Sequence, residues 1–481
     1  MTDRHPQNRF YLNLNERKLS VLVHSLFSSW MLAFLFEGQI FYSLADAYKF
    51  DPASMVFCGV AAMFAGLLLC GLFIKSKKAA KRLFLCSYPS FIAVSAMFFF
   101  PPSMFWTVGL IVGSFLAGGC VAAWAFYLKS STPKNERIKP VADMLILSNI
   151  LMVLLNMAAI HLSPHIGLAL SMFMLLSAFA FALKLPTDRD ATPVTSSEQK
   201  ESPVGVARLL VFLWLFIVTI TINSGLMYEV VNPAFAHLEG ITSWYWAVPY
   251  IAALFVMRNL PRRMNRAYIL YVAIAMIGLS FICFMVLGRG AVSYLVINTL
   301  MLGAFGVYDL FWWSILGEML EFHKNPATVL GMGLSANVLG VLLGGLIGRA
   351  LLSSNIPSLN PTLLALAVVC VTLILLPPLH KHLSSLLKGH AYLSVFSDLS
   401  AQEQSGQLVQ AARFGNLSER EGQVTSLLLQ GKTYRTIAGE LNISENTVKY
   451  YVKNIYSKFN IQSRAELITL MLKKEDTAPP K

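Results

Sequence analysis

The chain has 481 residues, of which 56% are hydrophobic and only 13% are charged, and its formal net charge is +13. Soluble domains carry about 25% charged residues, so this composition excludes a chain made only of soluble domains and indicates a surface that largely faces lipid. The positive charge fits two sources, which are basic cytoplasmic loops and a nucleic-acid-binding module. The six cysteines lie inside apolar stretches without paired spacing, so we expect neither a disulfide framework nor a metal site.

The first segment, residues 1–18, is polar and basic and is expected to form a cytoplasmic N-terminus. The apolar stretch that follows, from Leu19 to Leu44, is longer than the core of a signal peptide, which spans about 7–15 residues. We therefore interpret this stretch as a membrane span that is kept in the mature protein.

Stretches of apolar residues long enough to cross a bilayer as helices, which takes about 20 residues, recur between residues 19 and 380. They number twelve and cover 19–45, 53–74, 83–100, 104–128, 141–162, 164–184, 208–232, 243–257, 267–287, 291–320, 327–353 and 361–380. The expected fold class is therefore all-α, with a polytopic transmembrane helix bundle of about twelve spans.

Basic residues give the expected orientation of this bundle. Lys and Arg cluster before span 1 and after spans 2, 4, 8 and 12, whereas the alternate loops hold only Lys49 and Arg289. Because basic loops stay on the cytoplasmic side, both termini are expected in the cytoplasm. The predicted location is a bacterial cytoplasmic membrane, with membrane lipid around the spans.

The polar segment 185–207 divides the spans into two sets of six, and a short basic loop follows the second span of each set. This parallel plan of two halves resembles the major facilitator fold. The loop signature of that family, Gly-x-x-x-Asp-Arg-x-Gly-Arg, is absent, although residues 71–82 keep Gly71 and a basic cluster without the acidic residue. The resemblance implies a transporter-like architecture for residues 19–380.

Ionisable residues inside the spans are the candidates for a functional site. A charge near the bilayer centre costs about 2.5–3.5 kcal/mol on insertion scales, so it is seldom placed there without a function. Aromatic residues lie near these charges in the sequence, and we predict a pocket for an unknown small-molecule ligand, open to the outside. Its predicted lining is Glu37, Tyr42, Tyr228, Glu229, Tyr308, Asp309, Trp312 and Arg349. The alternative is that these side chains only lock helices together through hydrogen bonds.

Two other patterns in the spans are expected to be structural. Gly340, Gly344 and Gly348 recur at four-residue spacing and would let helix backbones approach closely. Trp244 and Trp246 lie at a predicted outer boundary, where tryptophan commonly anchors a protein in the interface.

The composition changes after the last span. Residues 381–416 are polar and are interpreted as a linker, which as a coil would extend about 30–36 Å. Residues 417–474 have the pattern of four short helices, and 475–481 form a tail. The first helix begins with a capping box of Ser418 and Glu421, while Thr433, Ser444 and Ser463 are the expected caps of the next three.

The second and third of these helices are joined by the tight turn 441–444, which is the helix-turn-helix arrangement. In that motif the second helix enters the major groove of double-stranded DNA. The third predicted helix places apolar residues such as Val448 and Val452 on one face. Its other face carries Asn446, Lys449, Tyr450, Lys453 and Ser457.

This module resembles the LuxR/NarL-type DNA-binding domain. The matching positions are Leu417, Ser418, Glu419, Arg420, Glu421, Gly431, Ile437, Ala438, Leu441, Ile443, Ser444, Thr447, Val448, Lys449, Asn454, Ile455, Tyr456, Lys458, Arg464, Ala465, Glu466 and Leu467. The resemblance implies that Lys449, Tyr450 and Lys453 face the bases and that Thr447 and Lys458 contact phosphate. It also implies a homodimer formed through the fourth helix.

Together these features favour a membrane-bound one-component transcription regulator, controlled by a small molecule that the membrane domain senses. The linker is too short for a phosphorylation receiver, since domains usually exceed about 50 residues. The alternative is a secondary transporter with an attached regulatory DNA-binding domain. An enzyme is not expected, and no cofactor is implied, because the sequence shows no phosphate-binding glycine loop, nucleophile elbow or metal-ligand spacing.

Overall fold

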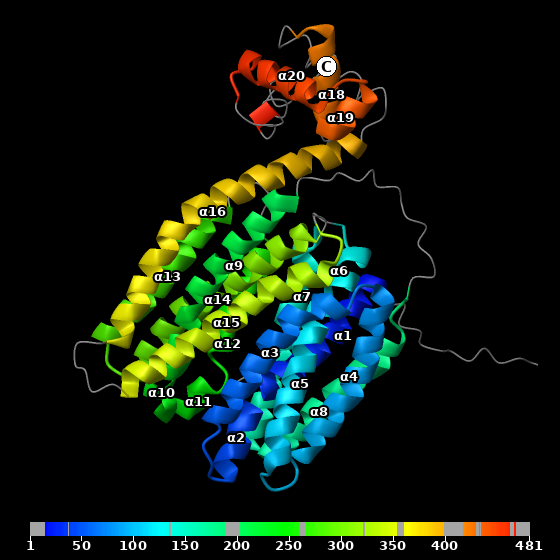
Figure 1. The fold of residues 1–481 in the computed structure, drawn as a ribbon. Coiled ribbons are helices and arrows are strands. Elements are labelled where there is room, and N and C mark those ends of the chain that lie inside the picture. The colour runs from blue at the N-terminus through cyan, green and yellow to red at the C-terminus, as the bar shows by residue number, and fades with distance from the viewer. Residues whose placement is uncertain are drawn as a thin grey trace, which may run out of the picture. The chain divides into compact units, whose positions relative to one another are not determined.

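Every secondary-structure element in the described part of the chain is helical, as expected (Figure 1). The computed structural model describes residues 15–36, 38–133, 136–187, 203–259, 266–320, 323–353, 360–398, 417–429, 432, 434–461 and 466–467. The chain divides into two compact units. One comprises the helical bundle, residues 1–190 and 213–375, and the other contains the C-terminal helices.

The first half of the bundle follows the predicted spans closely. Local signals start several of its helices, since Ser76 Oγ accepts a hydrogen bond from Ala79 N and Ser163 Oγ accepts one from His165 N. The helices are α1 (Glu16–Trp30), the π-helix η1 (Met31–Leu35), α2 (Gln39–Ala47), α3 (Ala53–Phe73), α4 (Lys77–Met97), α5 (Met104–Ala123), α6 (Ala125–Ser131), α7 (Ile138–His161) and α8 (Pro164–Leu183).

The second half is more broken near its first helices. A second π-helical turn there again follows a long helix directly, as η1 does in the first half. The elements are α9 (Pro203–Leu226), η3 (Met227–Val231), α10 (Asn232–Ala234), η4 (Ala236–Leu238), α11 (Glu239–Thr242), α12 (Ala247–Arg258), α13 (Arg266–Val286), α14 (Ala291–Met319), α15 (Pro326–Ser353) and α16 (Pro361–Asp398).

Ten helices within the described residues are long and apolar enough to cross a membrane. A pair bent by 46°, residues 236–242 and 247–258, makes an eleventh candidate. The remaining predicted span coincides with α4, whose first turns carry Lys77, Lys78, Lys81 and Arg82. Each predicted span therefore corresponds to a helical segment, and the protein is a membrane protein.

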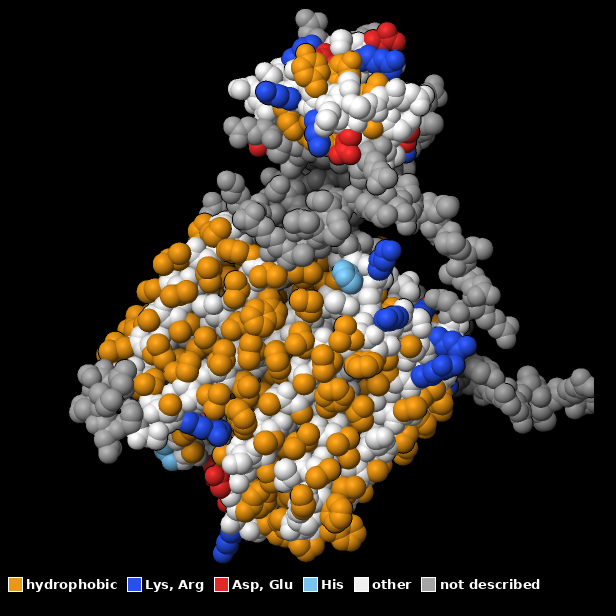
Figure 2. All heavy atoms as spheres, viewed as in Figure 1, with side chains coloured by type: hydrophobic (Ala, Val, Ile, Leu, Met, Phe, Trp, Pro, Cys, Tyr) orange, Lys and Arg blue, Asp and Glu red, His pale blue; other side chains and the backbone are white. Residues whose placement is uncertain are grey.

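The sides of the bundle are apolar. Figure 2 shows a nearly continuous cover of hydrophobic side chains along the helices, with Lys and Arg gathered mainly at one end of the bundle. Phe73, Phe105 and Ile374 are each at least 70% exposed. Exposed apolar surface of this extent is what lipid contact requires.

The helices of the bundle approach closely at glycines. A Cβ at Gly340 would meet Thr221 and the carbonyl oxygen of Val218, and one at Gly344 would meet the carbonyl oxygen of Ile222. Gly340 and Gly344 of α15 thus lie directly against the backbone of α9, as their spacing predicts, whereas a Cβ at Gly348 would meet the Glu229 side chain of η3.

The first part of the expected linker, residues 381–398, is helical. Helix α16 continues through Pro377 and Pro378 to Asp398. The change in composition at residue 381 marks where apolar residues become sparse, while leucines at 383, 386 and 387 still recur at helical spacing.

The C-terminal helices form the expected compact module. Three of the four predicted helices are described, namely α18 (Glu419–Leu429), α19 (Tyr434–Glu440) and α20 (Glu445–Lys458). Of the fourth only Glu466 and Leu467 are described, both helical, and the remainder of that predicted helix, together with Thr433, Ser463 and the tail, lies outside the described residues.

Candidate DNA-binding surface and membrane cavity

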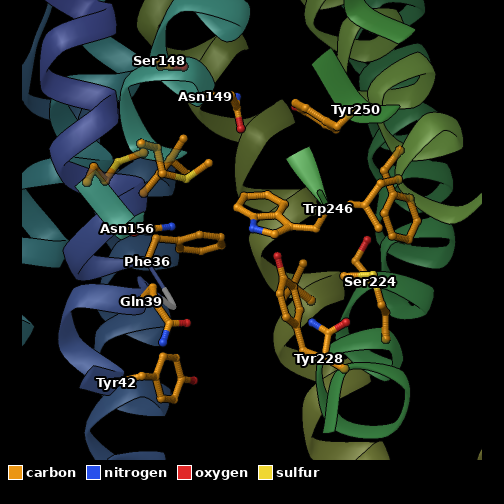
Figure 3. A pocket seen from close by; sticks show the side chains of 18 of the residues that line it. Phe36, Gln39, Tyr42, Ser148, Asn149, Asn156, Ser224, Tyr228, Trp246 and Tyr250 are labelled. Atoms are coloured by element: carbon orange, nitrogen blue, oxygen red, sulfur yellow. The ribbon is translucent and has the colours of Figure 1, made fainter. Parts of the chain in front are cut away.

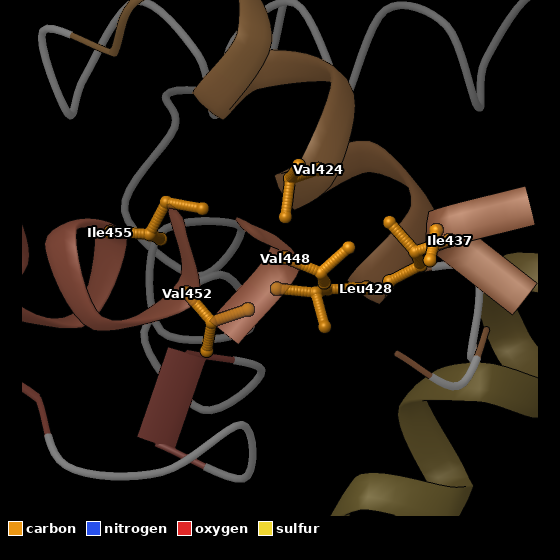
Figure 4. Packing of buried hydrophobic residues seen from close by; sticks show 7 residues of the cluster. Val424, Leu428, Ile437, Val448, Val452 and Ile455 are labelled. Carbon is orange, nitrogen blue, oxygen red and sulfur yellow. The ribbon is translucent and has the colours of Figure 1, made fainter. Parts of the chain in front are cut away.

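Helix α20 is held in place by a small apolar core. Val448, Val452 and Ile455 pack against Val424 and Leu428 of α18, with Ile437 of α19 completing the cluster (Figure 4). All six are at most 4% exposed. Because these three α20 residues recur at helical spacing, burying them turns the opposite face of the helix outward.

The turn between α19 and α20 has the geometry of a helix-turn-helix. Asn442 adopts the left-handed conformation with φ 53°, which asparagine tolerates better than most residues. The backbone N–H of Ile443 donates to the carbonyl oxygen of Ala438 at 2.9 Å. Ser444 Oγ then accepts a hydrogen bond from Thr447 N at 3.1 Å and starts α20.

The predicted base-contacting residues share the outward face of α20. Lys449 and Lys453 are exposed, and Tyr450 is 62% exposed. Lys449 Nζ lies 3.6 Å from Glu445 Oε1, a solvent-exposed pair that DNA can readily displace. Thr447 is half-buried, and its hydroxyl is 2.7 Å from Ser444 Oγ at the start of the helix.

Lys458, expected from the resemblance to contact phosphate, faces α18 instead of standing free. Its Nζ lies 2.6 Å from Glu421 Oε2, and the Glu421 side chain is only 6% exposed. Glu421 also accepts a hydrogen bond from Ser418 N at 2.7 Å, and Ser418 Oγ accepts one from Glu421 N at 3.3 Å, which is the predicted capping box. Burial opposes ionisation of Glu421, but the hydrogen bonds from Lys458 and Ser418 outweigh it and lower the pKa of the carboxyl group.

A large cavity lies between the two halves of the bundle (Figure 3). Its volume is about 1150 Å³. One wall carries Phe36, Gln39, Tyr42, Ser148, Asn149 and Asn156, and the facing wall carries Ser224, Tyr228, Trp246 and Tyr250. A cavity of this size exceeds what one drug-sized ligand needs, which is about 300–1,000 Å³.

The structure brings six of the eight predicted pocket residues to this cavity, namely Tyr42, Tyr228, Glu229, Asp309, Trp312 and Arg349. Arg349 Nε and Glu229 Oε1 form an ion pair at 2.7 Å. Glu37 lies outside the described residues.

Tyr308 does not line the cavity, contrary to the prediction. It is fully buried, and its hydroxyl donates to the carbonyl oxygen of Leu270 on α13 at 3.1 Å. Successive helix residues point about 100° apart, so Asp309 faces the cavity while its neighbour Tyr308 faces α13.

Sequence reasoning missed several lining residues. Tyr250 donates its hydroxyl hydrogen to Asp309 Oδ2 at 2.5 Å, and Trp246, expected to be an interfacial anchor, lines the cavity. Asn149 and Asn156 both line it from α7. Their seven-residue spacing, two helical turns, is the feature of the sequence that indicates a shared polar face.

At the end of the bundle that contains α6, side-chain hydrogen bonds connect the two halves. Asn325 Nδ2 donates to the carbonyl oxygens of Gly71 and Ile74 at 2.7 and 2.9 Å. The buried guanidinium of Arg137 donates to the carbonyl oxygen of Gly317 at 2.8 Å, and Arg258 binds Asp143 with two nitrogens. The cavity lining, in contrast, reaches residues 46–53 and 236–243 at the other end of the bundle.

In the parts of the chain that the structure describes, no three His, Cys, Asp or Glu side chains come together in a group able to hold a metal ion.

Comparison with known proteins identifies the C-terminal module. Residues 415–471 match the model of GerE, described as bacterial regulatory proteins of the luxR family. The spore germination protein GerE of Bacillus subtilis is 39% identical over 57 residues, which are 12% of this chain and 77% of that protein. A putative HTH-type transcriptional regulator in the exeN 3′ region of Aeromonas salmonicida is 48% identical over 63 residues, which are 13% of this chain and 32% of that protein.

Through this module the chain belongs to the luxR family of bacterial regulatory proteins. The domain is a DNA-binding domain of the LuxR type. The chain spans only about a third of the length of the Aeromonas relative.

The membrane bundle matches a different set of solved structures. The human organic anion transporter MFSD10 (TETRAN) superposes with a TM-score of 0.56 at 14% identity, covering 75% of this chain and 98% of that one. The major facilitator superfamily proton:xylose symporter XylE superposes with a TM-score of 0.55 at 12% identity, covering 75% of this chain and 94% of that one. At such low identity the likeness shows the fold alone, which is that of a major facilitator transporter, as the sequence predicted.

Proposed function

We propose that the protein is a membrane-bound, one-component transcription regulator. A small molecule binds in the cavity of the bundle, and its binding changes how the C-terminal helix-turn-helix occupies a promoter. The observation that carries this proposal is the presence, in one chain, of a LuxR-type DNA-binding domain and a transporter-like bundle with a cavity between its halves.

In this proposal α20 reads the DNA. Lys449, Tyr450 and Lys453 face the bases, and Thr447 contacts phosphate. The exposure of the first three and the burial of the opposite face of α20 support this assignment. Lys458 contacts phosphate only if its ammonium leaves Glu421 or bridges to both groups.

The orientation and assembly of the protein are part of the same proposal. The basic loops favour a cytoplasmic location for both termini in a bacterial membrane, where DNA is accessible. The bundle is surrounded by membrane lipid, as its apolar sides favour. On DNA the protein acts as a homodimer through the predicted fourth helix of the C-terminal domain.

The test is immunoprecipitation of tagged full-length protein followed by sequencing of the bound DNA. Discrete promoter peaks are expected for the unaltered protein and for Lys49→Ala, which removes an exposed lysine that follows α2 in the membrane bundle, outside the C-terminal module. The peaks should vanish in Lys449→Ala/Lys453→Ala. Equal peaks in the double variant would contradict the assigned face, and no peaks in any protein would contradict the regulator.

A second candidate is a secondary transporter with an attached regulatory domain. The large cavity and the major facilitator fold favour it. The missing loop signature weighs against it, because residues 71–82 hold no acidic residue. Uptake of a bound compound into vesicles that contain the purified protein would support this candidate.

A further inference from the structure

The cavity between the two halves of the bundle is strongly acidic. Five carboxyl groups line it, and Arg349 is its single Lys or Arg side chain among the described residues. The carboxyl groups belong to Asp46, Asp51, Glu229, Glu239 and Asp309. Because Glu229 binds Arg349 at 2.7 Å, the guanidinium is already neutralised and does not offset the other four acids.

Asp309 is the deepest of these acids by its place in the chain, near the middle of α14. It accepts a hydrogen bond from Tyr250, and no Lys or Arg among the described residues lies within ion-pair distance of it. A carboxylate in an apolar bundle without a cation is costly to keep charged. A cationic group bound beside Asp309 would recover much of that cost.

Aromatic side chains surround the same space. Trp312 and Trp313 follow Asp309 by about one helical turn and line the cavity, and Phe36, Tyr228 and Trp246 project into it in Figure 3. Aromatic faces attract cations and also bind apolar groups. The ligand for such a wall carries positive charge on an apolar or aromatic body.

Among the described residues of the wall, four buried polar atoms have no hydrogen-bond partner, namely Nδ1 of His24, Oδ1 of Asn156, Oγ of Ser243 and Nε1 of Trp312. Asn156 is only 5% exposed and Trp312 only 2% exposed. Buried polar atoms are normally paired. Figure 3 shows Asn156 at the cavity wall, where its amide group adds a polar side chain to the lining.

We infer that the cavity binds an organic cation with an aromatic or apolar body, whose charged group lies beside Asp309. This inference deepens the proposed function, because it names the class of molecule that the sensor takes. Its binding step is independent of DNA, so the two ideas are tested separately.

The experiment measures equilibrium binding of radiolabelled tetraphenylphosphonium to the full-length protein in lipid nanodiscs, with empty nanodiscs subtracted. Tetraphenylborate, which has nearly the same shape and the opposite charge, is the matched probe. Saturable binding is expected for the phosphonium only. Phenyltrimethylammonium should displace it, whereas tert-butylbenzene, the neutral analogue of the same shape, should not.

Variants locate the charged group. Asp309→Asn keeps the shape and the hydrogen bond from Tyr250, and it should weaken phosphonium binding at least tenfold. Glu136→Gln, which removes an acid that pairs with Arg17 outside the cavity, should leave binding unchanged. Both variants should elute as folded protein with the melting temperature of the parent.

Several outcomes would overturn the inference. These are equal binding of the borate, unaltered affinity in Asp309→Asn, or no saturable phosphonium binding by folded protein. If promoter peaks persist in that last case, the regulator stands and only the cationic ligand fails. Phosphonium binding without promoter occupancy would support the cavity assignment and refute the regulator.

Discussion

Replacing Lys458 by methionine should loosen the DNA-binding helices themselves, in addition to any effect on DNA. Methionine keeps the apolar stem of lysine but removes the ammonium that lies 2.6 Å from Glu421 Oε2. Glu421 is only 6% exposed, so the variant leaves a buried carboxylate with the capping contacts from Ser418 as its remaining described partners.

The size of the effect follows from this geometry. A hydrogen bond to a charged, buried acceptor contributes about 1.5–3 kcal/mol, and the 39% exposure of Lys458 argues for the lower half of that range. Since about 1.4 kcal/mol is a factor of ten, the open population of the module should rise about tenfold.

The pair also predicts a pH dependence. The folded-state pKa of Glu421 is lowered, so its contribution is complete above the ordinary pKa of glutamate, about 4.3, and is lost as the pH falls through the lower folded value. The difference between the parent and Lys458→Met should therefore shrink in acid.

Amide hydrogen exchange of the full-length protein measures this opening directly, in peptides from α18 and α20. Exchange at neutral pH should be about tenfold faster in Lys458→Met, and Glu421→Gln/Lys458→Met should recover part of the loss because no buried charge is left unpaired. Unchanged exchange combined with weaker DNA binding would refute the reasoning and make Lys458 a simple phosphate contact.

Three other predictions concern single positions. Gly344→Ala should lower the melting temperature of the bundle, at a cost of about 1–3 kcal/mol, because the new Cβ meets the backbone of α9. Gly345→Ala, where the nearest atom is 3.8 Å away, should leave it unchanged, and equal melting of the two would contradict the packing described. Lys453→Ala should reduce the preference for operator over random DNA by about 1–3 kcal/mol in competition gel shifts, so an unaltered preference would remove this residue from the base-reading face. Arg137→Gln should reduce the stability of the detergent-solubilised protein to heat by at least about 1 kcal/mol. The reason is that the carbonyl oxygens of Thr132 in the first half and Gly317 in the second lose a buried donor. A stability equal to that of the parent would show that water replaces the guanidinium.

Much of the architecture followed from local patterns in the sequence. A membrane span needs a continuous run of apolar residues, and the DNA-binding module needs caps and a tight turn at fixed spacing. Both patterns can therefore be recognised in the sequence without knowledge of the tertiary packing. Ser418, Asn442 and Ser444 act through neighbours two to four residues away, and the structure finds each of them in the expected local role.

The tertiary structure decided which side chains meet. Asp309 and Tyr308 are adjacent in sequence, yet the first faces the cavity and the second faces α13, because only the packing of α14 fixes its rotation. Tyr250 reaches Asp309 across 59 positions of the chain, and Lys458 reaches Glu421 across 37. Such contacts depend on how helices that are distant in sequence lie against one another, and no local period of hydrophobic residues encodes that arrangement.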